Sequence, residues 1–244
     1  MFHVKICGVT TAADAEMVAA AGADAIGLNF VQGSPRQLDL ADGREVAAAI
    51  PAGVLRVGVF AGSPVDDMLQ IARALCLDAI QLHGHLDGGR EPIDPPERCG
   101  QLSGLPVIRA VRLETSRPGT DALAAARQWI AAAVAAGAAP AMVIVDAAVS
   151  LGTEFGTESG TESGRLGGTG ERVDWTALAR AGSLPVPMAV AGGLTPDNVA
   201  EAVRVTGLSA VDTASGVEAT PGRKDQEKVR AFVAAARRGF EGLR

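Results

Sequence analysis

The sequence predicts a (β/α)8 barrel formed by a single domain over residues 1–244, and three observations lead to this prediction. The chain has 244 residues, close to the roughly 250 of a typical barrel of this class. Eight short runs rich in Val and Ile alternate with Ala-rich segments that also carry charges. The short runs are almost continuously apolar, which is typical of parallel strands that are buried on both faces.

Repeated strand–helix units imply right-handed crossovers and therefore a parallel sheet, and eight of them favour closure into a barrel. The alternative fold is an open Rossmann-type sheet. A GxGxxG motif after the first strand would support that fold, but the turn there reads Cys7-Gly8-Val9-Thr10. We therefore expect the closed barrel.

The apolar runs give the expected strands Val4–Cys7, Ala25–Phe30, Leu55–Phe60, Ala79–His83, Val107–Val111, Met142–Asp146, Pro187–Ala191 and Ala210–Thr213. The expected helices lie at about 12–22, 40–50, 64–76, 120–137, 174–181, 196–205 and 224–240. A further helix between residues 91 and 100 must be short or irregular, because three prolines interrupt it.

Local signals mark several helix starts. Thr11 followed by Asp14 resembles a capping box, in which the two side chains bond to backbone N–H groups of the first turn. Ser63-Pro64 and Thr195-Pro196 each predict a proline at the first helical position, where the missing N–H costs nothing.

The composition excludes several classes of function. Hydrophobic residues make up 48% of the chain, enough for a sizeable core. The net charge is −6 and no basic cluster is visible, so a nucleic-acid partner is not expected. Aromatic residues make up 3% and Tyr is absent, which argues against base stacking. No uninterrupted apolar run reaches 18 residues, so no membrane partner is expected.

The cysteines Cys7, Cys76 and Cys99 are widely separated and odd in number, and no CxxC pair is present. A disulfide framework or a zinc site is therefore not expected, and we predict no metal. A reducing compartment, the cytoplasm, follows from the same pattern.

Residues 152–164 interrupt the alternation of strands and helices with a threefold Gly-Thr-Glu repeat of almost no apolar content. Such a segment cannot bury enough surface to offset the entropy lost on ordering. We interpret residues 152–166 as a flexible insertion in the loop between the sixth strand and the sixth helix. That loop follows Asp146 at the end of the barrel where lids occur.

Active sites of (β/α)8 barrels lie at the carboxyl ends of the strands, so the polar residues there are candidates for function. They are Cys7, Asn29, Gln81, His83, Arg109 or Arg112, Asp146, Asp212 and Ser215. Taken singly, each has a structural explanation: Cys7 as a small buried hydrophobe, His83 as a hydrogen-bonded core histidine, Asp146 as the cap of the following loop. Together they would project into one barrel mouth.

Two glycine-rich loops at the same end indicate a phosphate site. In many barrels the loops after strands seven and eight bind phosphate through backbone N–H groups. Here Gly192 and Gly193 follow the seventh strand, and Ser215 and Gly216 follow the eighth. Glycines allow close approach of the backbone to an anion, and Ser215 adds a hydroxyl. Ordinary turn glycines are the competing explanation.

Seven motifs stand in order along nearly the whole chain: Lys5-Ile6-Cys7-Gly8, Ser34-Pro35-Arg36, Val57-Gly58-Val59-Phe60, Gln81-Leu82-His83-Gly84, Gly167-Gly168-Thr169-Gly170 with Asp174-Trp175, Ala191-Gly192-Gly193-Leu194-Thr195-Pro196 with Asn198, and Ser215-Gly216-Val217-Glu218 with Pro221-Gly222, Lys224 and Asp225. Together they resemble the phosphoribosylanthranilate isomerase family of tryptophan biosynthesis. One such match would carry little weight, whereas seven in the correct order are specific.

The resemblance implies an Amadori rearrangement of a phosphorylated ribosyl aminoaldose, without a cofactor. Cys7 matches the general base of the family and Asp146 its general acid. Arg36 matches the residue that holds the anthranilate carboxylate, for which a guanidinium fork is well shaped. His83, Lys5 and Asp212 are the further candidates for substrate binding. Both monomers and homodimers occur among similar barrels, so either state is compatible with the sequence.

The two catalytic roles place opposite demands on their surroundings. A thiol has an ordinary pKa of about 8.5, so a base role for Cys7 requires a setting that stabilises the thiolate. Lys5 lies two residues earlier on the same strand and faces the same side, where its charge can act. An aspartate that serves as an acid needs desolvation or a neighbouring anion.

Three departures from the family pattern stand out: the lengthened loop after Asp146, Ala214 where the family often has a second serine, and His85 where an acidic residue is common. The rival enzyme is the histidine-pathway isomerase of phosphoribosylformimino substrates, which uses an aspartate on strand one where this chain has Cys7. An enzyme that accepts both substrates is a further possibility, as is a non-catalytic barrel that binds a phosphorylated ligand.

Overall fold

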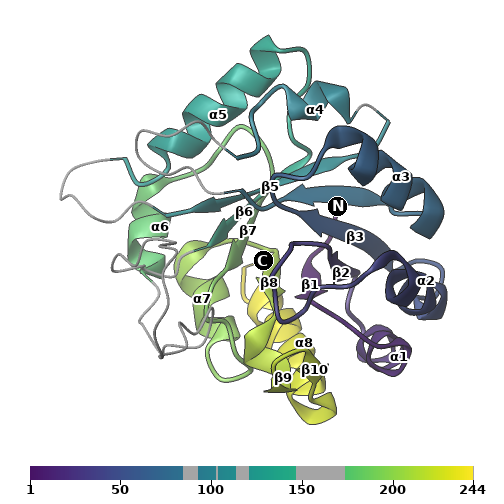
Figure 1. Cartoon of the computed structure of the whole chain (residues 1–244). Coiled ribbons are helices and arrows are strands. Elements are labelled where there is room, and N and C mark those ends of the chain that lie inside the picture. Colours follow the sequence, from purple (N-terminus) through teal and green to yellow (C-terminus); the bar gives the residue numbers. More distant parts are fainter. Residues whose placement is uncertain (85–92, 103, 114–120, 147–173, 244) are drawn as a thin grey trace, which may run out of the picture.

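The computed structural model describes residues 1–84, 93–102, 104–113, 121–146 and 174–243, and the expected insertion at 152–166 lies outside them, as does His85. The parallel strands pair in the order β1 to β8, and β8 pairs with β1 to close a barrel (Figure 1). They are β1 Val4–Cys7, β2 Ala25–Asn29, β3 Leu55–Phe60, β4 Ala79–Leu82, β5 Val107–Arg112, β6 Met142–Asp146, β7 Met188–Ala191 and β8 Val211–Thr213. The predicted fold class is confirmed, and the strand bounds differ from those expected by one residue at most.

The helices of the described residues form the outer layer around the strands (Figure 1). They are α1 Ala12–Ala20, α2 Leu40–Ala49, α3 Val65–Leu75, α4 Arg98–Gln101, α5 Ala124–Ala135, α6 Trp175–Ala181, α7 Val199–Thr206 and α8 Gln226–Glu241. The proline-interrupted fourth helix is short, as predicted. Within this part of the chain no helix has the length and apolarity needed to cross a membrane.

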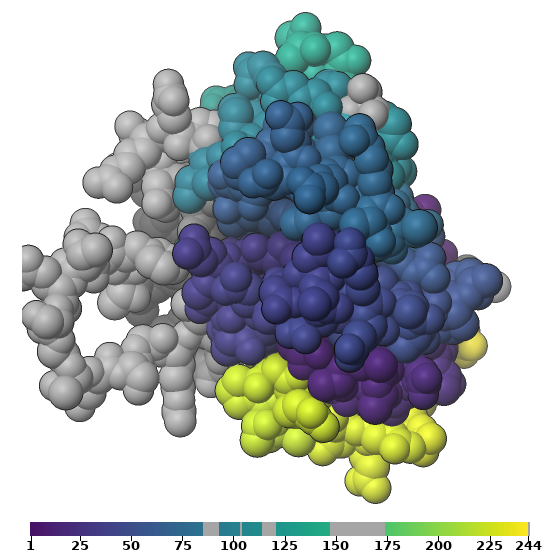
Figure 2. All heavy atoms as spheres, turned by 45° about the vertical axis from the view of Figure 1, so that its right-hand side comes forward, coloured from purple at the N-terminus to yellow at the C-terminus, as the bar shows by residue number. Residues whose placement is uncertain are grey.

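Side chains alternate between the two faces of each strand. On β1, Val4 and Ile6 belong to the large apolar cluster between strands and helices, so Lys5 and Cys7 point into the barrel. A second cluster fills the interior: Phe2, Ala25, Val57, Ala79, Ile108, Met142, Ile144, Ala189, Ala191 and Ala210. Its many alanines leave space for long polar side chains above them, which is why the upper barrel can hold a site. Figure 2 shows α1, α2 and α3 side by side on the outer surface, beside the C-terminal segment.

The predicted helix starts are confirmed in part. The Thr11 hydroxyl accepts a hydrogen bond from the Asp14 N–H at 3.1 Å. Asp14 does not complete the capping box, because its carboxylate accepts from the Lys224 N–H instead. The prolines were expected at the first helical position, and both expectations are wrong. Pro64 is itself the N-cap with ψ 143°, and α7 begins only at Val199.

The late start of α7 has a local cause. The Asn198 side chain accepts a hydrogen bond from the Thr195 N–H at 2.8 Å and donates one to the Gly193 carbonyl at 3.0 Å. These bonds hold residues 193–198 in a turn, so the chain turns before it becomes helical.

A short hairpin between β8 and α8 was not expected from the sequence. The segment after β8 forms a 3₁₀ turn at Ser215–Val217 and then the antiparallel strands β9 Glu218–Thr220 and β10 Arg223–Lys224. Pro221-Gly222 forms its turn, with Gly222 at φ 81°. The Thr10 hydroxyl donates to the Gly222 carbonyl, so the hairpin packs against the loop after β1 at the barrel mouth (Figure 1).

The opposite end of the barrel is held by Asp24. Its Oδ2 accepts from the His3 N–H at 2.9 Å and the Val4 N–H at 2.7 Å, while Oδ1 pairs with Arg237 of α8. Burial would raise the pKa of Asp24, but the hydrogen bonds from Val4, Arg237 and His3 outweigh it and lower the pKa.

We predict that Asp24→Asn lowers the free energy of unfolding at pH 7 by about 1–3 kcal/mol, because the carboxylate accepts bonds that an amide only partly replaces. A lowered pKa in the folded state gives stability above the ordinary value of 3.8, and this stability is lost as the pH falls below it. Urea unfolding at pH 7 and pH 3 measures both effects. The variant should lose less stability than the wild type between these pH values, and an equal loss would contradict the prediction. Exposed Asp197→Asn is the control.

Candidate active site

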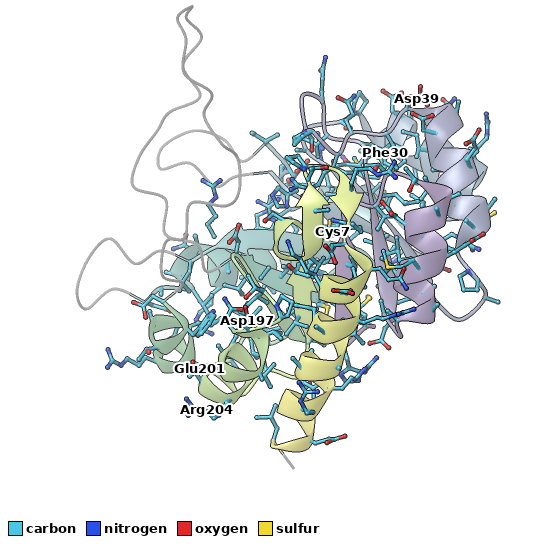
Figure 3. The ribbon with its side chains drawn as sticks, turned by 90° about the horizontal axis from the view of Figure 1, so that it is seen from below. Cys7, Phe30, Asp39, Asp197, Glu201 and Arg204 are labelled. Carbon is cyan, nitrogen blue, oxygen red and sulfur yellow. The ribbon has the colours of Figure 1, made fainter. Side chains whose placement is uncertain are left out.

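Cys7 ends β1 at the mouth of the barrel, where its thiol is partly exposed (Figure 3). Glycine on the neighbouring strand makes room for it: a Cβ atom built at Gly27 would lie 2.7 Å from the Cys7 sulfur. Gly27 also pairs directly with Cys7 in the sheet. The sequence thus leaves one side of the thiol free of side-chain atoms from β2.

Lys5 and Asp212 form an ion pair inside the barrel. They are direct partners across the β1–β8 seam, and the Lys5 ammonium lies 2.8 Å from the Asp212 carboxylate. Lys5 is fully buried. Burial would lower the pKa of Lys5, but the charge of Asp212, and next that of Cys7, outweigh it and raise the pKa. Lys5 therefore stays positively charged, and its charge interacts with Cys7, as the position of Lys5 two residues earlier on the strand predicts.

Asp146 ends β6 on the inward face, between Arg112 of β5 and Ala191 of β7 in the sheet register. Burial raises the pKa of Asp212. The charges of Lys5 and Lys224 oppose this rise, whereas the charge of Asp146 adds to it. Asp146 therefore lies within electrostatic reach of Asp212, and through the Lys5 pair it belongs to the same polar cluster as Cys7. The structure brings the two predicted catalytic residues to one mouth.

Arg36 lies on the loop after β2 and forms a two-pronged ion pair with Glu218. Its Nε and Nη2 atoms each donate to a separate Glu218 oxygen at 2.7 Å. Glu218 also accepts from the Lys224 ammonium at 2.8 Å. Hydrogen bonding to Glu218 raises the pKa of Arg36 despite burial, and the charge of Cys7 raises it further. Burial lowers the pKa of Lys224, although Glu218 and Cys7 counteract it.

Glu218 and Lys224 are site residues to which the sequence analysis gave no role, although both stand in the matched motifs. Each is buried, with side-chain exposures of 5% and 0%. The available signal was a pair of charged residues flanking a Pro-Gly turn. Because that turn was not interpreted as a hairpin, the two charges were not placed next to each other or next to Arg36.

His83 and Gln81 come from β4. His83 is exposed at the strand end, and its Nδ1 lies 3.5 Å from the Gln81 Nε2. Gln81 is 2% exposed and faces the interior, because Ile80 and Leu82 face the helices. Within the described residues, the Gln81 Oε1 has no hydrogen-bond partner. His83 therefore stands at the mouth as predicted and is not a core histidine.

The two predicted phosphate loops lie against each other. Gly192 and Gly193 adopt φ values of 89° and 60°, which favour glycine. A Cβ atom at Gly216 would lie 1.8 Å from the Leu194 carbonyl oxygen, so the loop after β8 touches the loop after β7. The Thr213 hydroxyl donates to the same carbonyl at 2.8 Å. Ser215 begins the 3₁₀ turn between them.

Arg109, one of the two arginines considered at the end of β5, does not reach the mouth. It faces the helices, donates to the Gly84 carbonyl at 2.7 Å and stacks over Trp129 with its Cζ 5.0 Å from the ring centre. Burial lowers the pKa of Arg109 to about 10, although Asp94 counteracts this. Alternation along β5 leaves Arg112 on the inward face. Across the described ranges, no group of three or more His, Cys, Asp or Glu residues could hold a metal ion.

Fold and site together define a (β/α)8-barrel enzyme with a thiol, paired cations and carboxylates at its mouth. Residues 4–235 match the protein family described as N-(5'-phosphoribosyl)anthranilate isomerase. The enzyme of that name from Myxococcus xanthus is 40% identical over 235 residues, which cover 96% of each chain. The enzyme from Neisseria meningitidis serogroup B is 38% identical over 236 residues, with 97% of each chain covered.

Solved structures agree with the sequence matches. Phosphoribosylanthranilate isomerase from Thermotoga maritima superimposes with a TM-score of 0.76 at 31% identity, covering 97% of this chain and 99% of that one. A structure of phosphoribosylanthranilate isomerase in complex with reduced 1-(o-carboxyphenylamino)-1-deoxyribulose 5-phosphate gives 0.72 at 28% identity, with the same coverage. The chain therefore belongs to the N-(5'-phosphoribosyl)anthranilate isomerase family. It is an enzyme that isomerises N-(5'-phosphoribosyl)anthranilate in tryptophan biosynthesis.

We predict that Lys5→Met lowers the free energy of unfolding by about 3–5 kcal/mol, because it leaves the Asp212 carboxylate buried without its partner. Lys5→Met combined with Asp212→Leu should regain most of this loss, since no lone charge then remains. The raised pKa of Lys5 makes the contribution complete below pH 10.5 and lost at higher pH. Urea unfolding at pH 7 measures each value. A loss below about 1 kcal/mol in Lys5→Met would contradict the buried ion pair.

Proposed function

We propose that Cys7 is the general base and Asp146 the general acid of an Amadori rearrangement that converts N-(5'-phosphoribosyl)anthranilate into 1-(o-carboxyphenylamino)-1-deoxyribulose 5-phosphate. The observation that carries this proposal is the place of the Cys7 thiol, at the barrel mouth and within the fields of Lys5, Arg36 and Lys224. The product named here is the compound whose reduced form is bound in a solved relative.

The reaction needs one proton donor and one proton acceptor, and it is redox-neutral. Asp146 protonates the ribose ring oxygen while the anilino nitrogen lone pair forms a C1′=N bond, so the C1′–O bond breaks and the ring opens. Cys7 then removes the C2′ proton, and that electron pair forms the C1′=C2′ bond of an enolamine as the nitrogen becomes neutral. Transfer of a proton from the C2′ hydroxyl to C1′ gives the ketone, and the proton that Cys7 took up passes through solvent back to Asp146, which restores both groups. No cofactor enters this balance.

The surroundings suit both roles. Lys5, Arg36 and Lys224 bring positive charge to the surroundings of Cys7, and a thiol that acts as a base needs such a setting. Asp146 lies close enough to Asp212 for its charge to add to the raised pKa of Asp212, so the proposed acid has a second carboxyl group nearby. The two residues belong to different strands, β1 and β6, so they can act on the substrate from different sides.

Substrate binding divides the mouth into two ends. Arg36 holds the anthranilate carboxylate, while the N–H groups of Gly192, Gly193 and Gly216 hold the phosphate together with the Ser215 hydroxyl. His83, Lys5 and Asp212 also belong to substrate binding: the exposed His83 contacts the substrate, whereas the buried pair of Lys5 and Asp212 orients it through its charges. Loops that already touch each other form a compact anion site with little ordering left to do on binding.

Domain organisation, compartment and oligomeric state complete the proposal. The chain forms one barrel domain over residues 1–244, and residues 152–166 are an insertion within it. A catalytic thiol must stay reduced, so we assign the enzyme to the cytoplasm. It works as a monomer or a homodimer, with the phosphorylated sugar as its small-molecule partner.

We predict that Cys7→Ala and Asp146→Asn each lower kcat by about 10²–10⁴-fold, because each removes one proton-transfer group. A fluorescence assay that follows loss of N-(5'-phosphoribosyl)anthranilate measures the rates. Cys76→Ala and Asp197→Asn, changes of the same kind at exposed positions, should retain wild-type rates. Activity near the wild-type value in Cys7→Ala or Asp146→Asn would remove that residue's role.

A second assay separates the reaction from its rivals. The purified enzyme is offered the histidine-pathway phosphoribosylformimino substrate under the same conditions. We expect turnover of the anthranilate substrate and none of the histidine-pathway compound. Turnover of both would identify an enzyme with two substrates, and product binding without turnover would favour a non-catalytic barrel.

A further inference from the structure

Glu218 holds two cations at the barrel mouth and is itself almost fully buried. Its two carboxylate oxygens receive the Nε and Nη2 atoms of Arg36, and one of them also receives the Lys224 ammonium. The Lys228 ammonium donates to the Glu218 carbonyl at 2.8 Å, which fixes its backbone as well. Burial would raise the pKa of Glu218, but the bonds from Arg36 and Lys224 outweigh it and lower the pKa. Glu218 therefore stays ionised and keeps both contacts at neutral pH.

The way in which Glu218 binds Arg36 leaves a defined part of the guanidinium available. A guanidinium has five N–H donors in one plane. Glu218 occupies the side edge, formed by Nε and Nη2, so the end edge formed by Nη1 and the second Nη2 hydrogen remains. Within the part of the chain that the structure describes, no protein acceptor occupies that end edge. A second carboxylate can bind there in the same two-pronged way.

The Arg36 side chain is also confined by its neighbours. A Cβ atom at Gly8 would lie 2.3 Å from the Arg36 Cδ, and Gly8 adopts φ 68°. Glycine at this position therefore lets the arginine stem pass directly over the loop after β1, beside Cys7. The stem is held by Gly8 and the head by Glu218, so the direction of the free edge is fixed.

Glu218 further connects the two ends of the mouth. Lys224 donates to the Ala214 carbonyl at 3.0 Å, immediately before Ser215 in the loop assigned to phosphate. One carboxylate thus links the Arg36 loop to the loop that follows β8. The cluster of two cations and one anion keeps a net charge of +1, which suits one additional carboxylate.

We infer that Glu218 is a positioning residue that fixes the Arg36 guanidinium and thereby sets the preference of the enzyme for a substrate with an aryl carboxylate. The inference rests on the proposed function, because it assumes that Arg36 holds the anthranilate carboxylate. Glu218 need not touch the substrate itself. Its contribution is to keep the free edge of Arg36 aimed at the place where the substrate carboxylate arrives.

The test compares the binding of two compounds by calorimetry. One is reduced 1-(o-carboxyphenylamino)-1-deoxyribulose 5-phosphate, and the other is the same molecule without the carboxyl group. Their ratio of Kd values measures carboxylate preference. In the wild type we expect a preference of about 10–100-fold, as for a charge-assisted hydrogen-bonded pair. Glu218→Gln should lower this preference at least about tenfold and change the Kd of the carboxyl-free compound by less than about threefold.

Kinetic measurements and a second variant distinguish a loss of positioning from a loss of folded structure. Glu218→Gln should raise KM while kcat stays within about threefold, because chemistry at Cys7 is not removed. Glu218→Gln combined with Lys224→Met removes the unpaired buried ammonium and should lose the same preference with a wild-type thermal unfolding midpoint. The matched control is Glu201→Gln, which breaks an exposed ion pair with Arg204 on the outer helix α7 (Figure 3). It should change neither the carboxylate preference nor KM.

Arg36→Met tests separately the positioning role of Glu218 and the assumption that Arg36 binds the anthranilate carboxylate. It should abolish the preference, and adding Glu218→Gln to it should cause no further loss, because both changes act through one interaction. If Glu218→Gln and its combination with Lys224→Met both bind the carboxylated compound as well as the wild type or more tightly, Glu218 only competes for Arg36 and the inference is overturned. If Arg36→Met retains the preference, the assigned role of Arg36 in the proposed function fails instead.

Discussion

The barrel closes where β1 pairs with β8, and this seam brings Lys5 directly beside Asp212 although they are 207 residues apart in sequence. A buried ammonium and a buried carboxylate tolerate desolvation only as a pair, so the charges require the seam to form in one register. The same register sets Cys7 one inward position above Lys5, at the mouth. Fold closure and placement of the thiol thus depend on one buried contact.

Charge is then organised around the thiol in two ion-paired groups. Lys5 with Asp212 lies on the seam, and Arg36 with Glu218 and Lys224 lies over the loops after β1, β2 and β8. In each group a carboxylate holds its cations in place and limits their net charge. The mouth therefore stays positive enough to bind anions, while no buried cation of these two groups is left without a counter-charge.

The sequence was sufficient to predict the strands, because continuous apolar runs are typical of parallel strands in a barrel, and the residues at their carboxyl ends followed from this topology. Cys7 and His83 were predicted on this basis, and Arg36 from the motif after the second strand. The side that a residue faces near a strand end depends on alternation, so Arg109 and Arg112 lie on opposite faces of β5, and the sequence left open which of them reaches the mouth. Glu218 and Lys224 received no role from the sequence, although both stand in the matched motifs, because strands of three and two residues are too short to show a periodicity.

The central claim is that Cys7 takes the C2′ proton, and an isotope effect tests it most directly. The kcat of substrate carrying deuterium at C2′ is compared with that of ordinary substrate, in the wild type and in Cys7→Ser. If Cys7 is the base, the serine hydroxyl removes the proton more slowly because it is scarcely ionised near neutral pH, so the deuterium effect on kcat should rise in the variant. A fall in kcat without any rise in the isotope effect would place the proton transfer elsewhere and contradict the account.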